Sequence, residues 1–216
     1  MASLPFEGAH ARVARAIQRQ AILTNVRSTY ATVPGTHHGA GFEPYARFSA
    51  PMREVVGVYL HGEALQMMEG PAGEPDPEAL RREVVESANR SKDAQRAMND
   101  LVNRRVIDRL FEADLAAARA SRRVWRGTVM GASGSKLHVQ LDDPAIDVKV
   151  YLFDLAKRWG GVWLEPDEHG VVLRERESKR VRAIAGDAIA LRVVKRDRGR
   201  DRWVLEAVAV GPEAEA

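Results

Sequence analysis

The clearest structural pattern in the chain lies at residues 124–141, which read VWRGTVMGASGSKLHVQL. From Lys136 onward apolar and polar residues alternate, so Leu137, Val139 and Leu141 share one face of a strand. The glycine- and serine-rich GASGS at 131–135 is typical of a tight turn between two strands. The stretch therefore predicts a β-hairpin with one buried face and one polar face.

Further short strands are expected on the C-terminal side of this hairpin. Apolar alternation recurs in three segments, which are 146–152, 188–195 and 203–210. An irregular insert is expected at about residues 156–183, where charged residues and glycines interrupt the pattern. Five short strands of this kind indicate a small barrel of the OB type. We predict an OB domain over residues 121–211 and a disordered tail at 212–216.

Before residue 121 the apolar spacing is helical instead. The pattern predicts a loop-rich stretch from Ser28 to Ala50, where glycine and proline are frequent. It also predicts a break near Asn89. The expected helices span 8–25, 51–68, from Asp76-Pro77-Glu78 to that break, and 92–118. Helices followed by an antiparallel barrel make this an α+β protein, with a mainly helical first domain at residues 1–120.

Composition excludes several classes of chemistry. The 216 residues include no cysteine, so disulfides, thiolate zinc sites and a cysteine nucleophile are ruled out. No stretch approaches the about 18 consecutive apolar residues of a membrane span, and no secretory signal is visible. We expect a cytoplasmic protein without a membrane partner.

Charge is nearly balanced in total but uneven along the chain. With 33 Lys and Arg against 30 Asp and Glu, the formal net charge is +3. Arginines gather in short clusters, which are compatible with phosphate contacts to nucleic acid. The alternative is a solvated surface of salt bridges, because acidic residues lie between most of them. The clusters are Arg12, Arg15 and Arg19; Arg104, Arg105 and Arg109; Arg119, Arg122 and Arg123; and Arg196, Arg198, Arg200 and Arg202.

Metal and nucleophile motifs are weak. Asp142, Asp143 and Asp147 could hold Mg²⁺ as in a nuclease, but Asp-Asp-Pro between two strands is ordinary turn chemistry, which we favour. His37 and His38 are adjacent, and no further ligand stands at a spacing that completes a site. The chain has no phosphate-binding loop motif, dinucleotide fingerprint or nucleophile elbow.

A more specific segment is GAGFEPYARFSAPMR at residues 39–53. A glycine-bearing loop leads through Tyr45 and Phe48 into an expected helix N-terminus, with Arg53 in its first turn. Helix-end N–H groups and a guanidinium together form an arrangement that can bind phosphate, and aromatic rings beside it can stack on bases.

Around this segment the chain resembles the closing part of the RNB catalytic domain of ribonuclease II and ribonuclease R enzymes. The resemblance spans Tyr30 to Leu65, and the family's later A-E-R stretch is similar to 102–104, followed by an S1-type OB domain as in the family. Residues 1–120 would then be the C-terminal portion of an RNB domain. The residues in register with the family pattern are Tyr30, Pro34, His37, Gly39, Gly41, Tyr45, Phe48, Ser49, Pro51, Arg53 and His61.

This resemblance implies hydrolysis of single-stranded RNA from the 3′ end to nucleoside monophosphates, with Mg²⁺ held by aspartates. Arg53 matches the arginine that contacts the scissile phosphate. The metal-binding aspartates belong to an earlier part of the domain that this chain lacks, so no metal ligand is assigned here. A complete site would need a second chain carrying the N-terminal RNB portion. The residues expected to contact RNA are Tyr45, Phe48, Ser49, His61, Arg104, Trp125, His138 and Tyr151.

The sequence also departs from the family pattern. Glu54 replaces the second arginine of the motif, Gly62 replaces the arginine after His61, and Asn103 replaces the glutamate of A-E-R. The usual aromatic F-G-x-F of the OB domain reads Ser-Lys-Leu-His at 135–138, and Trp125 and Phe153 can equally be barrel core. The alternative function is therefore a non-catalytic, degenerate module that binds RNA or a protein.

Overall fold

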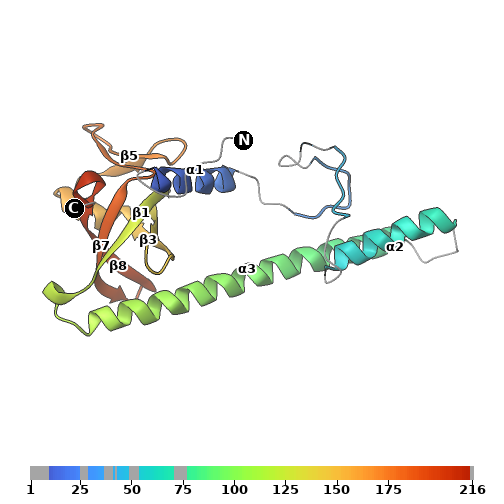
Figure 1. The fold of residues 1–216 in the computed structure, drawn as a ribbon, viewed down its shortest axis with the longest axis horizontal. Helices are drawn as coiled ribbons and strands as arrows, with labels where there is room; N and C mark the ends of the chain where they lie inside the picture. The colour runs from blue at the N-terminus through green and yellow to red at the C-terminus, as the bar shows by residue number, and fades with distance from the viewer. Residues whose placement is uncertain are drawn as a thin grey trace. The chain divides into compact units, whose positions relative to one another are not determined.

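The computed structural model describes residues 10–24, 29–36, 41, 43–48, 54–70 and 77–214. It contains two compact units (Figure 1). The described residues of Asn25–Val102 form what we call the helical unit, and those of Met1–Thr24 and Asn103–Ala216 form the β unit. The division into domains at residue 120 stays a prediction. No described helix is long and apolar enough to cross a membrane.

The helical unit is built on helices α2 (Val55–Glu69) and α3 (Pro77–Leu115), of which α3 continues into the β unit. Val56, Val84 and Ala88 form its small buried cluster. The predicted break near Asn89 is wrong, since α3 is continuous there. The Asn89 side chain bonds the backbone N and O of Tyr30 at 3.0 and 2.9 Å, so its hydrogen-bonding capacity does not compete with the helix backbone.

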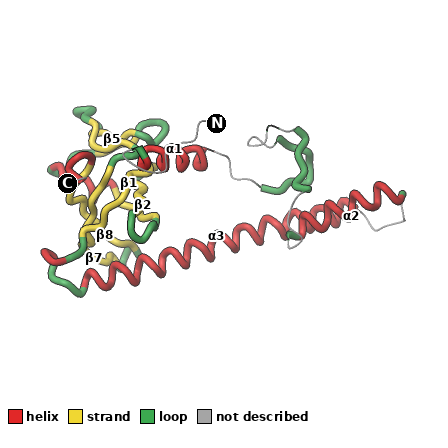
Figure 2. Tube along the Cα trace, in the orientation of Figure 1, coloured by secondary structure: helices red, strands yellow, loops and turns green. Residues whose placement is uncertain are grey.

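The β unit contains a five-stranded antiparallel sheet with the order β3-β2-β1-β7-β8. The predicted hairpin is confirmed by β1 (Val124–Ser133) and β2 (Lys136–Leu141), and β3 (Asp147–Tyr151) extends it. Helix α4 (Leu152–Ala156) follows β3. The remaining strands, β7 (Ala188–Asp197) and β8 (Arg202–Val210), return to pair on the other side of β1. Figure 2 shows these strands in yellow.

The expected irregular insert at 156–183 instead contains a second, three-stranded sheet. Its strands are β4 (Leu164–Pro166), β5 (Val172–Glu175) and β6 (Val181–Ile184). Charged residues hid this pattern, because Glu175 is buried and accepts a bond from Arg182 Nε at 2.6 Å. An ion pair thus occupies positions where an apolar alternation would have signalled strands.

Three short 3₁₀ helices complete the β unit: η1 (Arg119–Ser121), η2 (Lys157–Trp159) and η3 (Gly211–Ala214). Ala214 of η3 is buried against Ala188 and Ala190. The disordered tail at residues 212–216 stays a prediction. The last two residues lie outside the described part of the chain.

The main core lies on the inner face of the five-stranded sheet, and the end of α3 covers part of it. Leu137, Val139 and Leu141 are buried, as the alternation predicts. Phe111 of α3 meets the rings of Trp125 and Trp203 edge-on, with centroids 5.5 and 5.4 Å apart. These contacts join the last turns of α3 to the sheet.

Helix α1 (Ala11–Thr24) confirms the predicted first helix and packs on β1. Arg15 Nη2 donates to Thr128 Oγ1 at 3.2 Å, and Gln20 Nε2 donates to the Met130 carbonyl at 2.9 Å. The helix sits so close to Gly186 that a Cβ there would lie 3.1 Å from the Val13 Cα. Glycine therefore permits the docking of α1, which carries its arginines to the outer side of the sheet.

Candidate nucleic-acid interface

The outer face of β2 and β3 carries a polar strip. Lys136, His138 and Gln140 alternate with the buried residues of β2. Opposite them on β3 stand Tyr151, Lys149 and Asp147, in that order. We call these six residues the β2–β3 strip. Two lysines, a histidine and a tyrosine on one pleated face are groups that bind phosphates and stack on bases.

Tyr151 stands at one end of the strip between two cationic side chains. The Arg202 guanidinium lies 4.0 Å from the centre of the Tyr151 ring, and Lys136 Nζ lies 5.6 Å from it. Arg202 is held in place by the buried Asp154, whose Oδ2 accepts a bond from Nη1 at 2.7 Å. This anchoring limits the side-chain entropy that a bound base would otherwise remove.

His138 lies in the middle of the strip and is half-buried. Its Nε2 is 2.7 Å from Ser133 Oγ. Burial lowers the pKa of His138, and the charges of Lys149 and Arg19 lower it further, while Asp147 opposes them. His138 is therefore neutral at pH 7, and the positive charge of the strip itself comes from its two lysines.

The three aspartates considered as magnesium ligands each face a different arginine. Asp147 Oδ2 is 2.7 Å from Arg19 Nη1, Asp142 Oδ1 is 3.7 Å from Arg15 Nη2, and Asp143 Oδ2 is 3.4 Å from Arg123 Nη2. Asp142 and Asp143 lie directly after β2, in the bend where the sequence predicts a turn. Within the described ranges no three acidic or histidine side chains converge to hold a metal ion. These residues do not fit a magnesium site.

In the helical unit two of the predicted RNA contacts come together. Phe48 and His61 meet edge-on with ring centroids 4.6 Å apart, and His61 Nε2 donates to the Phe48 carbonyl at 2.9 Å. Phe48 and Tyr45 are both exposed. Ser49 and Arg53 lie outside the described residues, so their predicted roles are not tested.

Glu54, which replaces an arginine of the family motif, is engaged within the helical unit. Its Oε1 accepts a bond from Arg47 Nη2 at 3.0 Å, and its Oε2 lies 3.3 Å from the Tyr30 hydroxyl. Burial raises the pKa of Tyr30, and Glu54 adds to this while Arg47 opposes it. The tyrosine is therefore a neutral hydrogen-bond donor to the carboxylate.

The other predicted contacts lie in the β unit. Arg104 is exposed and pairs with Asp201. Trp125 is only 3% exposed, and its Nε1 donates to Asp114 Oδ2 at 2.5 Å, so its ring has no face free for a base. The expectation that Trp125 contacts RNA is thus corrected. Its alternative assignment to the core matches the structure.

Two aromatic side chains that project into solvent were not assigned as RNA contacts from the sequence. Phe153 is 72% exposed at the start of α4, and Trp163, just before β4, is 73% exposed. Position was the available signal, since Phe153 comes two residues after Tyr151 of the strip and Trp163 comes two residues after the paired glycines 160–161. Phe153 was considered for either core or stacking, and the structure excludes the core.

Structure comparison identifies a known fold. The apo form of Mycoplasma genitalium RNase R matches with a TM-score of 0.64 and 14% identity, over 89% of this chain and 30% of that one. The same enzyme in complex with ribose-methylated single-stranded RNA matches with a TM-score of 0.61 and 13% identity, over 94% and 32%. The sequence matches no protein-family model and no curated protein. The fold is RNase R-like, and the chain spans about a third of those RNase R chains.

Proposed function

We propose that this chain is an RNA-binding module of the RNase R type, in which residues 121–211 of the β unit form an S1-type OB domain. Support comes from the strand order β3-β2-β1-β7-β8 with α4 after β3. The stack of Arg202 on Tyr151 also draws the edge strands β8 and β3 together, as closure of a five-stranded barrel requires. One RNase R chain of this fold was solved with single-stranded RNA.

The β2–β3 strip is the observation that carries the binding proposal. Lys136 and Lys149 supply positive charge for phosphates, and Tyr151, held in place by Arg202, supplies an aromatic ring for stacking. A single strand can lie along this face because its bases are free to stack on side chains. Tyr45, Phe48, Ser49, His61 and Arg104 are proposed as further RNA contacts, with Arg53 on the scissile phosphate.

Hydrolysis is proposed only for an assembly with a second chain. That partner would carry the N-terminal RNB portion and the carboxylates for Mg²⁺, which supplies Lewis-acid activation of the phosphate when bound. The apolar surface of α2 supports such a partner. Val55, Val58 and Leu65 recur at helical spacing and are exposed, on the side away from the buried Val56. Uncovered apolar stripes of this kind mark interaction surfaces.

The alternative is a degenerate module that binds RNA or a protein without catalysis in any assembly. Glu54 favours it, because a carboxylate paired with Arg47 stands where the family motif has a second arginine. A negative charge beside the expected phosphate position opposes binding of the scissile group.

Fluorescence anisotropy with a labelled single-stranded RNA tests the binding proposal. The full chain should bind, and binding should weaken steeply as salt rises from about 50 to 200 mM because counterions are released. Lys149→Gln should flatten the salt dependence by about 0.7 in log–log slope, the value for one phosphate contact with a single strand. Binding that is absent, or unaffected by salt, would overturn the proposal.

A nuclease assay of the same chain with Mg²⁺ tests the proposal of incompleteness. The expected result is no degradation by the chain alone, with or without EDTA. Degradation that requires Mg²⁺ and is lost in Arg53→Ala would show that the chain is catalytically complete. Activity restored by a co-expressed N-terminal RNB portion would exclude the degenerate alternative.

A further inference from the structure

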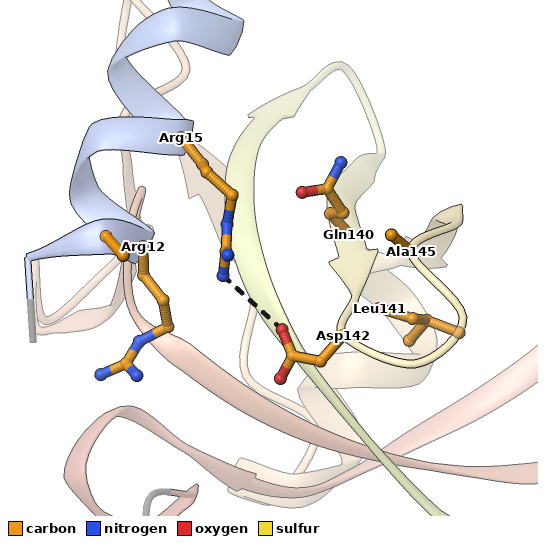
Figure 3. Close-up of a pocket in the computed structure, with 7 residues that line it drawn as sticks. Arg12, Arg15, Gln140, Leu141, Asp142 and Ala145 are labelled. Carbon is orange, nitrogen blue, oxygen red and sulfur yellow. Dashed lines mark ion pairs between the residues drawn. The ribbon is translucent and has the colours of Figure 1, made fainter. Parts of the chain in front are cut away.

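A pocket of about 330 Å³ lies between helix α1 and the end of β2, within the β unit. Its volume is at the lower end of the range of small-ligand sites, so it suits one small group rather than a large molecule. Figure 3 shows Arg12 and Arg15 extending from α1, with Gln140 on the facing strand and Asp142 below it. The lining residues are Ala11, Arg12, Arg15, Gln140, Leu141, Asp142 and Ala145.

The charged lining favours an anion. Two arginines against one aspartate leave a formal charge of 2 − 1 = +1 at the pocket wall. The Arg15–Asp142 contact of 3.7 Å is too long for a hydrogen bond, so this carboxylate does not use the donors of the guanidinium. Arg15 Nε, like the Nε atoms of several other described arginines, is a buried donor without an acceptor. An anion at Arg15 would relieve part of this unsatisfied hydrogen-bonding capacity.

The pocket is continuous with the β2–β3 strip. Gln140 belongs to both, and it pairs with Asp147 on β3 and with Thr128 on β1, the residue that Arg15 contacts. From Lys136 to Gln140 is four residues of strand, or about 13 Å. One OB fold binds about 4–16 nucleotides, so a strand that stacks at Tyr151 can extend this far.

We propose that this pocket binds a phosphodiester of single-stranded RNA, with Arg12 and Arg15 as the cationic contacts and Gln140 as an amide donor. The proposal rests on the proposed RNA binding and adds a contact supplied by α1, outside the barrel strands. Arginine suits the role because its planar fork binds two phosphate oxygens at once. In the proposed complex Arg15 binds the phosphate and keeps its hydrogen bond to Thr128, and that hydrogen bond holds α1 on the sheet.

The test compares Arg12→Gln and Arg15→Lys with a matched control, Arg176→Gln. Arg176 lies in the same unit, is 68% exposed and is 3.9 Å from its ion-pair partner Glu165. Binding of a labelled oligouridylate is measured against salt for the full-length proteins, and thermal unfolding verifies that each one folds. Arg12→Gln should lower the log–log salt slope by about 0.7, whereas Arg176→Gln should leave it unchanged.

Arg15→Lys keeps the charge and removes the fork. It should therefore weaken binding of the oligonucleotide several-fold while leaving the salt slope close to that of the wild type. In ¹⁵N spectra of the full chain, the Gln140 side-chain amide and the Arg15 Nε resonance should shift on titration with the oligonucleotide. Equal salt slopes for Arg12→Gln and Arg176→Gln, with unmoved resonances, would overturn the proposal.

Other outcomes separate this inference from the proposed function. If Lys149→Gln weakens binding and Arg12→Gln does not, the strip binds RNA and the pocket proposal alone is refuted. If the wild type binds no RNA, the proposed function itself fails. Shifts at Gln140 with inorganic phosphate but not with the oligonucleotide would identify a site for a free phosphate, which also overturns binding of a strand.

Discussion

Replacing Phe111 by alanine should unfold the β unit at a much lower denaturant concentration. Phe111 is 1% exposed and contacts two tryptophan rings at centroid distances of 5.4 and 5.5 Å. Truncation of a buried phenylalanine costs about 3–5 kcal/mol, through lost burial and the cavity that remains. At a urea m-value of about 2 kcal/mol/M, the transition should move by about 2 M.

Tryptophan fluorescence is the appropriate assay, because all four tryptophans of the chain lie in the β unit. Phe153→Ala is the matched control, since the same side chain is removed at a position that is 72% exposed. The Lys157 ammonium lies 5.0 Å from the centre of the Phe153 ring, so removing this ring should cost less than about 1 kcal/mol. Equal destabilisation by the two variants would refute the packing of α3 on the tryptophans.

Three further predictions concern the β unit. Arg202→Met removes one of the two cationic partners of the buried Asp154, the other being Lys157, and should cost about 1.5–3 kcal/mol in urea unfolding. Adding Asp154→Asn should recover part of this loss, and no recovery would argue against the pair. The pKa of His138 is lowered in the folded state, so the unfolded chain takes up this proton first as pH falls below about 6.5. The wild type should therefore lose more stability than His138→Gln between about pH 7.5 and 5.5. Parallel curves of melting temperature against pH would contradict this. Gly186→Ala places a Cβ against Val13 at a φ of +101°, so trypsin should cut faster within α1, and unchanged digestion would show that α1 docks otherwise.

The sequence predicted only some of the residues in the β2–β3 strip. The β2–β3 strip contains His138 and Tyr151, which were predicted, together with Lys136 and Lys149, which were not assigned. In the sequence, lysines on the polar face of a strand cannot be told from ordinary surface lysines. Strand pairing is what places Lys136 and Lys149 on the same face. Trp125 was assigned to RNA because an aromatic residue near a barrel suggests stacking. The contacts that bury it come from α3, which sequence periodicity does not relate to β1.

The local elements of this protein follow from residue patterns within single segments. The alternation at 136–141 encodes β2 because side chains on a strand point to opposite faces, and the helical spacing of apolar residues indicates α1. Only the tertiary structure brought α1 onto β1, with Arg15 bonded to a threonine 113 residues away. It also decided that Trp125 is buried and Phe153 exposed. The reason is physical: periodicity records which residues of one element share a face, whereas burial depends on the distant segment that covers that face.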